Sequence, residues 1–258
     1  MRELANQCAL ITGAGSGMGR VAAQALAAEG ATVAVLDISD VGGRETVQLI
    51  ESAGGSATFY RLDVADPDAV AEVIPRVARD LGGLHVVVNN AGVEGAHVKL
   101  ADIPVDDYQR VMNIDLAGVF YCLKAEIPLM LEHGGSIINT ASASGLIGGY
   151  NLAAYTAAKH GVIGLTKAAA MDYGTTDLRI NALCPGLIDT PFLAELSENQ
   201  LAHLLSGTPM GRVGEPSEIA DAIVWLASKR SSFVLGHALC VDGGATLGGN
   251  TTNLANMD

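Results

Sequence analysis

Residues 8–19 read CALITGAGSGMG, and this stretch decides the fold. The apolar run 8–12 predicts a buried strand, and the pattern over 18–29 predicts a helix directly after the glycines. The glycines follow the spacing TGxxxGxG, because Met18 occupies the place where the spacing GxGxxG requires its third glycine. A strand, a glycine-rich turn and a helix in this order are typical of a pyrophosphate site built from backbone amides.

The alternation of strand and helix continues along the chain. Short apolar runs predict strands at 8–12, 32–37, 57–62, 85–89, 135–140, 178–183 and 237–241. Helical patterns lie between them, at 18–29, 40–53, 67–81, 106–131, 150–173, 191–206 and 216–228. Because the strands are mostly apolar throughout and alternate strictly with helices, the sequence predicts an α/β fold, a Rossmann-type doubly wound parallel sheet in a single domain over 1–258.

The composition excludes several classes of protein. With 15 basic and 28 acidic residues, the formal net charge is −13, which repels nucleic acid and anionic lipid surfaces. The apolar runs are far shorter than the ~20 residues of a membrane helix, and the start MRELANQ lacks the features of a secretory signal. Cys8, Cys122, Cys184 and Cys240 form no CxxC pair. We therefore expect a cytoplasmic protein with buried thiols, no metal site, and no nucleic-acid or membrane partner.

The predicted helix 150–173 has no polar face. Its small residues lie on all sides, and they are Ala153, Ala154, Ala157, Ala158, Gly161, Gly164, Ala168, Ala169 and Ala170. Such a helix must be covered, in part by the sheet and in part by another surface. We therefore expect a homo-oligomer in which a second copy packs closely against this helix.

The glycine turn suits a dinucleotide. Gly13 makes the turn, Gly17 lets the backbone approach a pyrophosphate, and Gly19 admits close packing of helix on sheet. A glycine-rich turn without a ligand is the alternative, but the position between the first strand and the first helix favours the binding site.

Asp37 ends the second predicted strand, where a carboxylate can accept hydrogen bonds from both ribose hydroxyls of an adenosine and repels a 2′-phosphate. No basic residue lies in the glycine loop or directly after Asp37, where Ile38 and Ser39 follow. The sequence therefore favours NAD over NADP. The alternative for Asp37 is a helix cap.

Two further strand ends carry polar residues. Asp63 and Val64 follow the third strand and either contact the adenine edge or form a turn. The segment NNAG at 89–92 ends the fourth strand, where the asparagines are expected mainly to brace neighbouring strand ends and Gly92 lets the chain pass close to a cofactor.

The candidate catalytic residues follow the fourth and fifth strands. Tyr155 and Lys159 lie four residues apart in a predicted helix and share one face, where an ammonium favours the phenolate. Ser142 lies just past the fifth strand and can hold a substrate oxygen, with Ser144 as a competitor. Asn113, inside the long predicted helix, either holds a water that passes protons to Lys159 or is an ordinary surface or interhelix asparagine.

These residues together resemble the short-chain dehydrogenase/reductase family. The resemblance rests on TGxxxGxG at 12–19, Asp63, NNAG at 89–92, Asn113, Ser142, Tyr155 with Lys159, PG at 185–186 and DGG at 242–244. It implies seven parallel strands in the order 3-2-1-4-5-6-7 and, commonly, a homotetramer.

The resemblance also implies roles for individual residues. Tyr155 would exchange a proton with the alcohol or carbonyl oxygen, and Ser142 would hydrogen-bond that oxygen. Lys159 would lower the pKa of Tyr155 and contact the nicotinamide ribose, while Asn113 would complete a water relay. The residues expected to bind NAD(H) are Gly13, Ser16, Gly17, Met18, Gly19, Asp37, Ile38, Asp63, Val64, Asn90, Ala91, Gly92, Tyr155, Lys159, Pro185, Gly186, Ile188 and Thr190.

In this family the amphipathic stretch at about 187–210 would cover the substrate. The expected pocket is mainly apolar, and its liners are Val93, Ser144, Leu146, Leu187, Phe192 and Met210. Glu94 and His97 are interpreted as residues of a solvated loop. The tail 245–258 is expected to strap a subunit interface or to fray.

The leading hypothesis is an NAD-dependent oxidoreductase that interconverts a secondary alcohol and its ketone. One alternative is a 3-ketoacyl-carrier reductase, against which Asp37 and the acidic charge both count. The other is a non-catalytic nucleotide sensor on the same fold.

Overall fold

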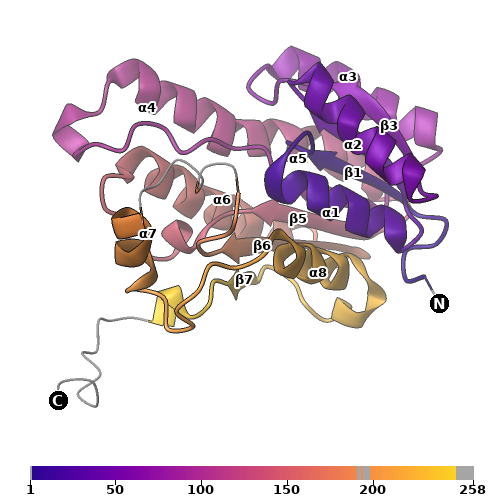
Figure 1. The fold of residues 1–258 in the computed structure, drawn as a ribbon. Coiled ribbons are helices and arrows are strands. Elements are labelled where there is room, and N and C mark those ends of the chain that lie inside the picture. The colour runs from indigo at the N-terminus through magenta and orange to yellow at the C-terminus, as the bar shows by residue number, and fades with distance from the viewer. Residues whose placement is uncertain (1, 191–192, 194–197, 248–258) are drawn as a thin grey trace.

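The sheet confirms the predicted architecture. The computed structural model describes residues 2–190, 193 and 198–247. Seven parallel strands pair in the order β3-β2-β1-β4-β5-β6-β7 (Figure 1). They are β1 Cys8–Thr12, β2 Thr32–Asp37, β3 Ser56–Arg61, β4 Val86–Asn89, β5 Gly135–Thr140, β6 Leu178–Pro185 and β7 Ala238–Val241. The order reverses between β1 and β4, so the carboxyl ends of these two strands open the crevice in which such sheets bind ligands.

Helices cover both faces of the sheet. They are α1 Gly17–Ala28, α2 Asp40–Ser52, α3 Pro67–Leu81, α4 Val105–Val111, α5 Gly118–Met130, α6 Ala153–Asp172, α7 Glu198–Leu205 and α8 Pro216–Ala227. One apolar layer joins the sheet to α3, α5 and α6, and a second joins it to α1, α2 and α8. The side chain of Asp66 accepts hydrogen bonds from the first turn of α3, which begins at Pro67 as the sequence predicts.

The long helix predicted over 106–131 is interrupted. Between α4 and α5, residues Met112–Ala117 form a π-helical turn, in which each amide bonds five residues back instead of four. The helix predicted from residue 150 begins at Ala153. The first part of the helix predicted over 191–206 lies largely outside the described residues, which contain only α7 of it.

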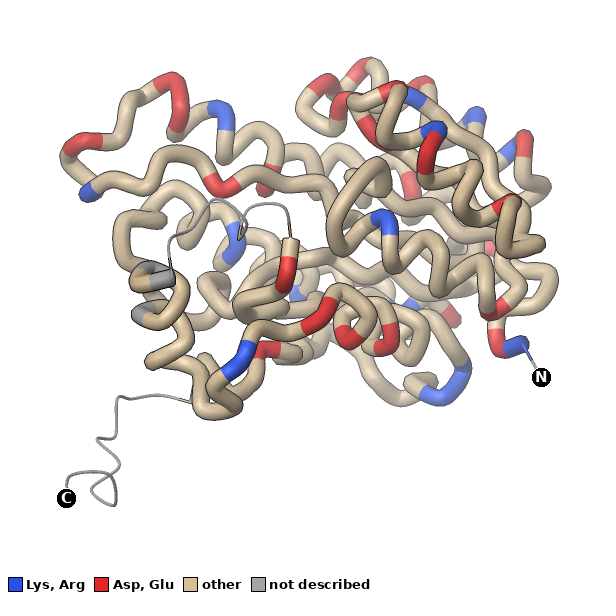
Figure 2. Tube along the Cα trace, in the orientation of Figure 1, with Lys and Arg blue, Asp and Glu red and all other residues tan. Residues whose placement is uncertain are grey.

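Charges are scattered over the surface. Figure 2 shows acidic and basic residues interspersed over the helices, without a continuous basic band in this view. Within the described ranges, no helix is both long and apolar enough to cross a membrane. The same residues contain no group of three or more His, Cys, Asp or Glu side chains that could hold a metal ion.

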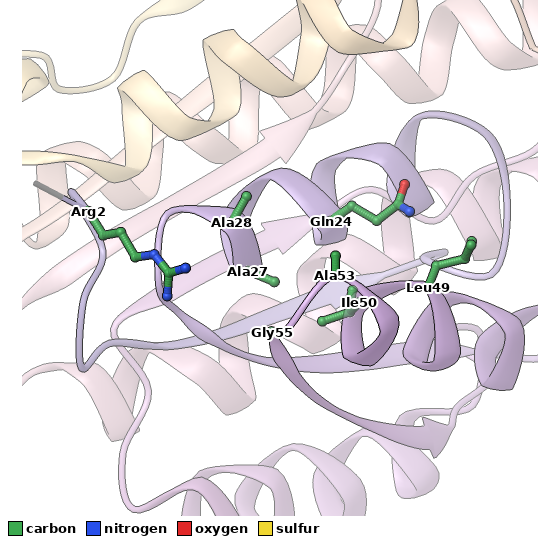
Figure 3. A pocket seen from close by; sticks show the side chains of 8 residues that line it. All are labelled: Arg2, Gln24, Ala27, Ala28, Leu49, Ile50, Ala53 and Gly55. Atoms are coloured by element: carbon green, nitrogen blue, oxygen red, sulfur yellow. The ribbon is translucent and has the colours of Figure 1, made fainter.

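A small cavity of about 70 Å³ lies between the carboxyl ends of α1 and α2, next to the start of β3. Figure 3 shows its lining, in which Gln24 and Ala27 of α1 lie across from Leu49 and Ile50 of α2, and Arg2 lies at one end. It lies at the edge of the sheet opposite the strand ends that bind ligands in this architecture. Its volume holds a few water molecules and is far too small for a dinucleotide.

A buried polar network ties β4 and β5 to the helices behind them. Asn89 Nδ2 donates to Glu126 Oε2 and to Asn139 Oδ1, each at 3.0 Å. Asn139 Nδ2 in turn donates to Thr166 Oγ1 at 3.0 Å, which connects β5 to α6. Burial raises the pKa of Glu126 to about 8, although the hydrogen bond from Asn89 opposes the shift. Glu126 is therefore largely uncharged at neutral pH.

We expect Glu126→Gln to remove a pH-dependent loss of stability. The pKa of Glu126 rises from 4.5 to about 8 on folding, so its contribution to stability is fully present below pH 4.5 and is lost as the pH rises toward 8. Glutamine has the same shape and does not ionise. In urea unfolding, the variant should gain about 2–4 kcal/mol relative to the wild type between pH 5 and pH 8.

The control is Glu132→Gln, at an exposed position just beyond the end of α5. It should leave the pH dependence of unfolding unchanged. The free energies of unfolding of the wild type and of E126Q could instead change in parallel with pH. That result would contradict the assignment of an uncharged Glu126.

Candidate active site

The turn between β1 and α1 forms a cradle in which side chains do not fit. Gly13 and Gly17 have φ angles of 64° and 51°, which favour glycine. A Cβ on Gly13 would lie 2.8 Å from Ala91 Cα, and one on Gly19 would lie 2.6 Å from Asn90 Nδ2. The turn can therefore pack directly against the segment after β4, and it leads into the amino end of α1, where helix amides attract a phosphate. These residues fit the pyrophosphate of a dinucleotide.

The end of β4 holds this turn in place. Thr12 Oγ1 accepts hydrogen bonds from the backbone amides of Asn90 and Ala91, at 3.0 and 3.1 Å. Asn90 Nδ2 donates to the carbonyls of Thr12 and Gly13, at 3.1 and 3.2 Å. The side chain of Asn90, expected to bind the cofactor, is therefore engaged with the glycine turn and supports a ligand there indirectly.

Asp37 lies at the end of β2 and faces the glycine turn. Its Oδ2 accepts from the amide of Gly15 at 2.7 Å, and its Oδ1 accepts from the amide of Ser39 at 2.8 Å. Ser39, not Asp37, is the N-cap of α2, because its hydroxyl accepts from the amide of Gly42. The alternative of Asp37 as a helix cap is thus wrong. Ile38 beside it is 57% exposed.

Arg20 lies in the first turn of α1, directly after the glycine loop, and its charge is engaged elsewhere. Its guanidinium pairs with Glu45 at 2.9 Å and donates to Thr46 Oγ1 at 3.0 Å. It also donates to the carbonyl of Gly15. A 2′-phosphate at this edge would meet the Asp37 carboxylate and an arginine that is already paired.

The remaining strand ends are arranged as follows. Asp63 Oδ1 accepts from the amide of Ala65 at 2.9 Å, so Asp63 forms a turn, which is one of its two predicted roles. Val64 is buried beneath Gly118, whose Cβ would lie 3.0 Å from Val64 Cγ2. At the end of β6, the amide of Gly186 donates to the carbonyl of Val241 at 3.0 Å, which fixes the chain beyond Pro185.

A cavity of about 600 Å³ lies at the carboxyl ends of β6 and β7. Leu187, Ile188 and Met210 line it together with the polar side chains of Arg212, Glu218 and Asp242. Of the five expected liners that the structure describes, Leu187 and Met210 line this cavity. Val93 packs instead in an apolar cluster with Val111, Ala154 and Ala158, and Leu146 is 38% exposed. Phe192 lies outside the described residues, and Thr190 lies at their edge.

Tyr155, Lys159 and Ser142 come together beside the crevice. Lys159 Nζ lies 5.4 Å from the centre of the Tyr155 ring. The hydroxyl of Ser142 accepts from the amide of Ser144 at 3.1 Å, which leaves its own proton free to bond the Tyr155 side chain. Lys159 Nζ also donates to the carbonyl of Thr140 at the end of β5, at 3.1 Å. A phenol, a hydroxyl and an ammonium at one strand edge can hold an oxygen and move a proton.

Asn113 does not belong to this group. Its side chain is exposed, in the π-helical turn. Asp115, two residues further on, is fully buried and lies 3.1 Å from Lys159 Nζ through Oδ2. Residues two apart point to nearly opposite sides of a helix, so only one of the pair can face α6. The structure therefore does not bring the Asn113 side chain to Lys159, and Asp115 lies beside that lysine instead.

The charges around Tyr155 act in opposite directions. Burial raises the pKa of Tyr155, the Lys159 ammonium and the Ser142 hydrogen bond lower it, and Asp115 and Glu94 raise it again. The net result is a pKa above the ordinary value. Burial lowers the pKa of Lys159, but the Asp115 carboxylate, together with Tyr155 and Cys184, raises it, and the net shift is upward. Lys159 is accordingly a firmly held ammonium.

Glu94 is closer to the site than a solvated loop residue would be. It contacts His97 Nε2 at 2.8 Å, and burial raises the pKa of Glu94, while the charge of His97 lowers it. The charges of Asp115 and Lys159 also act on it. Its position two residues after NNAG was the available signal in the sequence.

The sequence also contained a pattern that indicates a buried position for Asp115. Val111, Asp115 and Val119 repeat at helical spacing and are all buried. A charged residue in the apolar stripe of a helix needs a buried partner, and in this site the partner is Lys159.

Comparison with known proteins places the chain among oxidoreductases. A family profile described as enoyl-(acyl carrier protein) reductase matches residues 13–246. The chain is 41% identical over 251 residues to 2,5-dichloro-2,5-cyclohexadiene-1,4-diol dehydrogenase of Sphingobium indicum, covering 95% of this chain and 99% of that protein. It is 41% identical to cyclohexanol dehydrogenase of Acinetobacter sp., covering 93% and 95%. The crystal structure of NAD+-bound xylitol dehydrogenase superposes with a TM-score of 0.89 at 32% identity, covering 94% and 100%.

Gly92→Ala is expected to disrupt the centre of the site. A Cβ at this position would lie 2.9 Å from Asp115 Oδ2 and 3.1 Å from Lys159 Nζ. The variant should lose about 1–3 kcal/mol of stability and at least about tenfold in turnover, because both groups must move. Thermal unfolding and steady-state kinetics measure the two effects.

Gly164→Ala in α6 is the control, since a Cβ there would meet no atom within 4 Å. It should leave turnover unchanged and alter stability by no more than about 1 kcal/mol. Equal effects of the two substitutions would show that the crowding around Gly92 is unimportant.

Proposed function

Because the chain belongs to the short-chain dehydrogenase/reductase family, we propose that it is an NAD-dependent enzyme that interconverts a secondary alcohol and its ketone, with Tyr155 as general acid and base. Oxidation and reduction of alcohols and ketones is the activity of its named relatives. The observation that carries the proposal is the convergence of Tyr155, Ser142 and Lys159 at the strand edge next to the glycine cradle.

In this proposal Ser142, Tyr155 and Lys159 have separate roles in the reaction. Ser142 holds the substrate oxygen, and Tyr155 takes the hydroxyl proton during oxidation or returns it during reduction. Lys159, fixed by Thr140 and Asp115, keeps a positive charge near the phenol. The bound nicotinamide supplies the hydride chemistry. The chain itself orients the reacting groups, and positioning of this kind accounts for a large share of the rate enhancement of enzymes.

The cofactor would lie along the crevice between β1 and β4. The cradle at Gly13, Gly17 and Gly19, together with Ser16 and Met18, would hold the pyrophosphate. Asp37 would bind the adenosine ribose, and Lys159 the nicotinamide ribose. The remaining contacts are proposed for Ile38, Asp63, Val64, Ala91, Gly92, Pro185, Gly186, Ile188 and Thr190. A similar structure that holds NAD+ supports the choice of NAD.

For the substrate we propose an apolar secondary alcohol on a saturated or partly unsaturated ring. Two relatives at 41% identity are named for ring alcohols of this kind. A carrier-protein substrate is less favoured, because a chain with a net charge of −13 repels an acidic carrier. A sensor without catalysis would not require the buried Lys159 to be held beside Tyr155.

The quaternary arrangement and location are proposals as well. We propose a cytoplasmic homotetramer formed from single-domain subunits. The exposed positions of α6 include Ala157 and Ala168, whose small side chains allow another helix to approach closely.

Tyr155→Phe should abolish most turnover while cofactor binding persists. The substitution removes the hydroxyl that moves the proton and keeps the ring, so kcat should fall about 10³-fold. The production of NADH with cyclohexanol as substrate measures turnover, and fluorescence of bound NADH measures binding. Tyr150→Phe, at a side chain that is 96% exposed, is the control and should retain full activity. Full turnover by Y155F would overturn the role of Tyr155.

The wild type should prefer NAD to NADP by about 100-fold in kcat/KM, because the Asp37 carboxylate repels a 2′-phosphate. Asp37→Ser should reduce that preference to less than about tenfold. Asp40→Ser, an exposed acid at the start of α2, should leave it unchanged. A wild type more active with NADP than with NAD would overturn the role of Asp37.

A further inference from the structure

Asp115 and Lys159 form an ion pair that is closed off from solvent. Their side chains are 0% and 3% exposed, and Oδ2 lies 3.1 Å from Nζ. The other oxygen, Oδ1, accepts from the amide of Val93 at 2.8 Å. The carboxylate therefore connects the π-helical turn, the loop after β4 and α6 at a single point.

The lysine is held from a second side as well. Its Nζ donates to the carbonyl of Thr140 at 3.1 Å, so protein atoms on two elements fix the ammonium directly. Gly92 lies against the pair, because a Cβ on it would be within 3.1 Å of both Asp115 Oδ2 and Lys159 Nζ. A close charged pair with so little exposure has strong mutual attraction and loses much if one partner is removed.

The Asp115–Lys159 pair also changes the electrostatic potential at the Tyr155 hydroxyl. Lys159 is 5.4 Å from the centre of the Tyr155 ring, and its positive charge favours the phenolate. The negative charge of Asp115 lies 3.1 Å from that positive charge and offsets much of it. The other groups that act on Tyr155 are Glu94, in the loop after β4, and the hydroxyl of Ser142. On the far side, Cys184 of β6 also acts on Lys159.

We propose that Asp115 is a positioning residue that fixes the Lys159 ammonium through its carboxylate and, by offsetting that charge, makes Tyr155 act at a more alkaline pH than a neutral residue at this position would allow. The inference rests on the proposed role of Tyr155. It assigns to the carboxylate a direct contact with the lysine, in place of the water relay expected through Asn113.

Asp115→Asn tests the proposal. The asparagine oxygen can still accept from the Val93 amide, so the loop keeps its anchor, while the charge is lost. Tyr155 should then ionise about one pH unit lower, because the Lys159 charge is no longer offset. The first measurement is the absorbance of phenolate during a pH titration, taken as the difference from the same background carrying Tyr155→Phe. It requires no turnover.

The second measurement is the pH dependence of kcat/KM for oxidation of cyclohexanol. Its acidic limb should move down by the same amount. A shift in the titration without turnover in any variant would reject the proposed function and leave the inference standing. An unchanged titration in D115N would overturn the inference, whatever the activity.

Two controls make the outcome specific. Asp107→Asn removes an acid that anchors the same loop through the amide of Ala96, at 2.7 Å, and no contact joins it to Lys159 in the described part of the chain. It should not shift the titration. Asp115→Ser removes the charge with a smaller side chain and should shift it in the same direction as D115N, if the first variant folds poorly. A larger shift in Glu94→Gln than in either Asp115 variant would assign the effect to Glu94 and overturn the inference.

Discussion

The whole site depends on the close approach of two strand ends. The turn after β1 and the segment after β4 meet with almost no space between them, because Gly13 and Gly19 carry no side chain and Asn90 spans the gap. The Thr12 hydroxyl accepts hydrogen bonds from the backbone amides of both Asn90 and Ala91. This contact sets the glycine turn on one side of the crevice and brings Gly92 and Val93 against Asp115 on the other. The proposed phosphate site and the proposed proton-transfer site therefore depend on the same contact.

The fold was predictable because its signals are local and repeated. Buried parallel strands are apolar throughout, and the first turn of α3 is marked by Asp66 and Pro67. The positions of Tyr155, Lys159 and Ser142 followed from strand ends and helical spacing. The position of Asn113 near Lys159 was not predicted correctly, because a sequence motif does not show which side of a helix a residue occupies. The apolar stripe of Val111 and Val119 would have pointed to Asp115, which lies on it.

The cavity at the carboxyl ends of β6 and β7 could not be predicted in the same way. Its walls are contributed by segments far apart in the chain, such as Leu187 and Met210, and its polar members Arg212 and Glu218 bond each other at 2.7 Å across six residues. No periodicity marks residues that meet in this manner. The uncharged state of Glu126 could not be predicted either, since it arises from burial in the folded chain and not from its neighbours in sequence.

The π-helical turn between α4 and α5 has an evolutionary consequence. Such a turn contains one residue more than regular helical geometry needs, and it places Asp115 beneath Lys159. Deleting a residue there would regularise the backbone but rotate one half of the helix against the other by roughly 100°. Descendants of this chain can therefore exchange side chains in the turn much more easily than they can lose a residue from it.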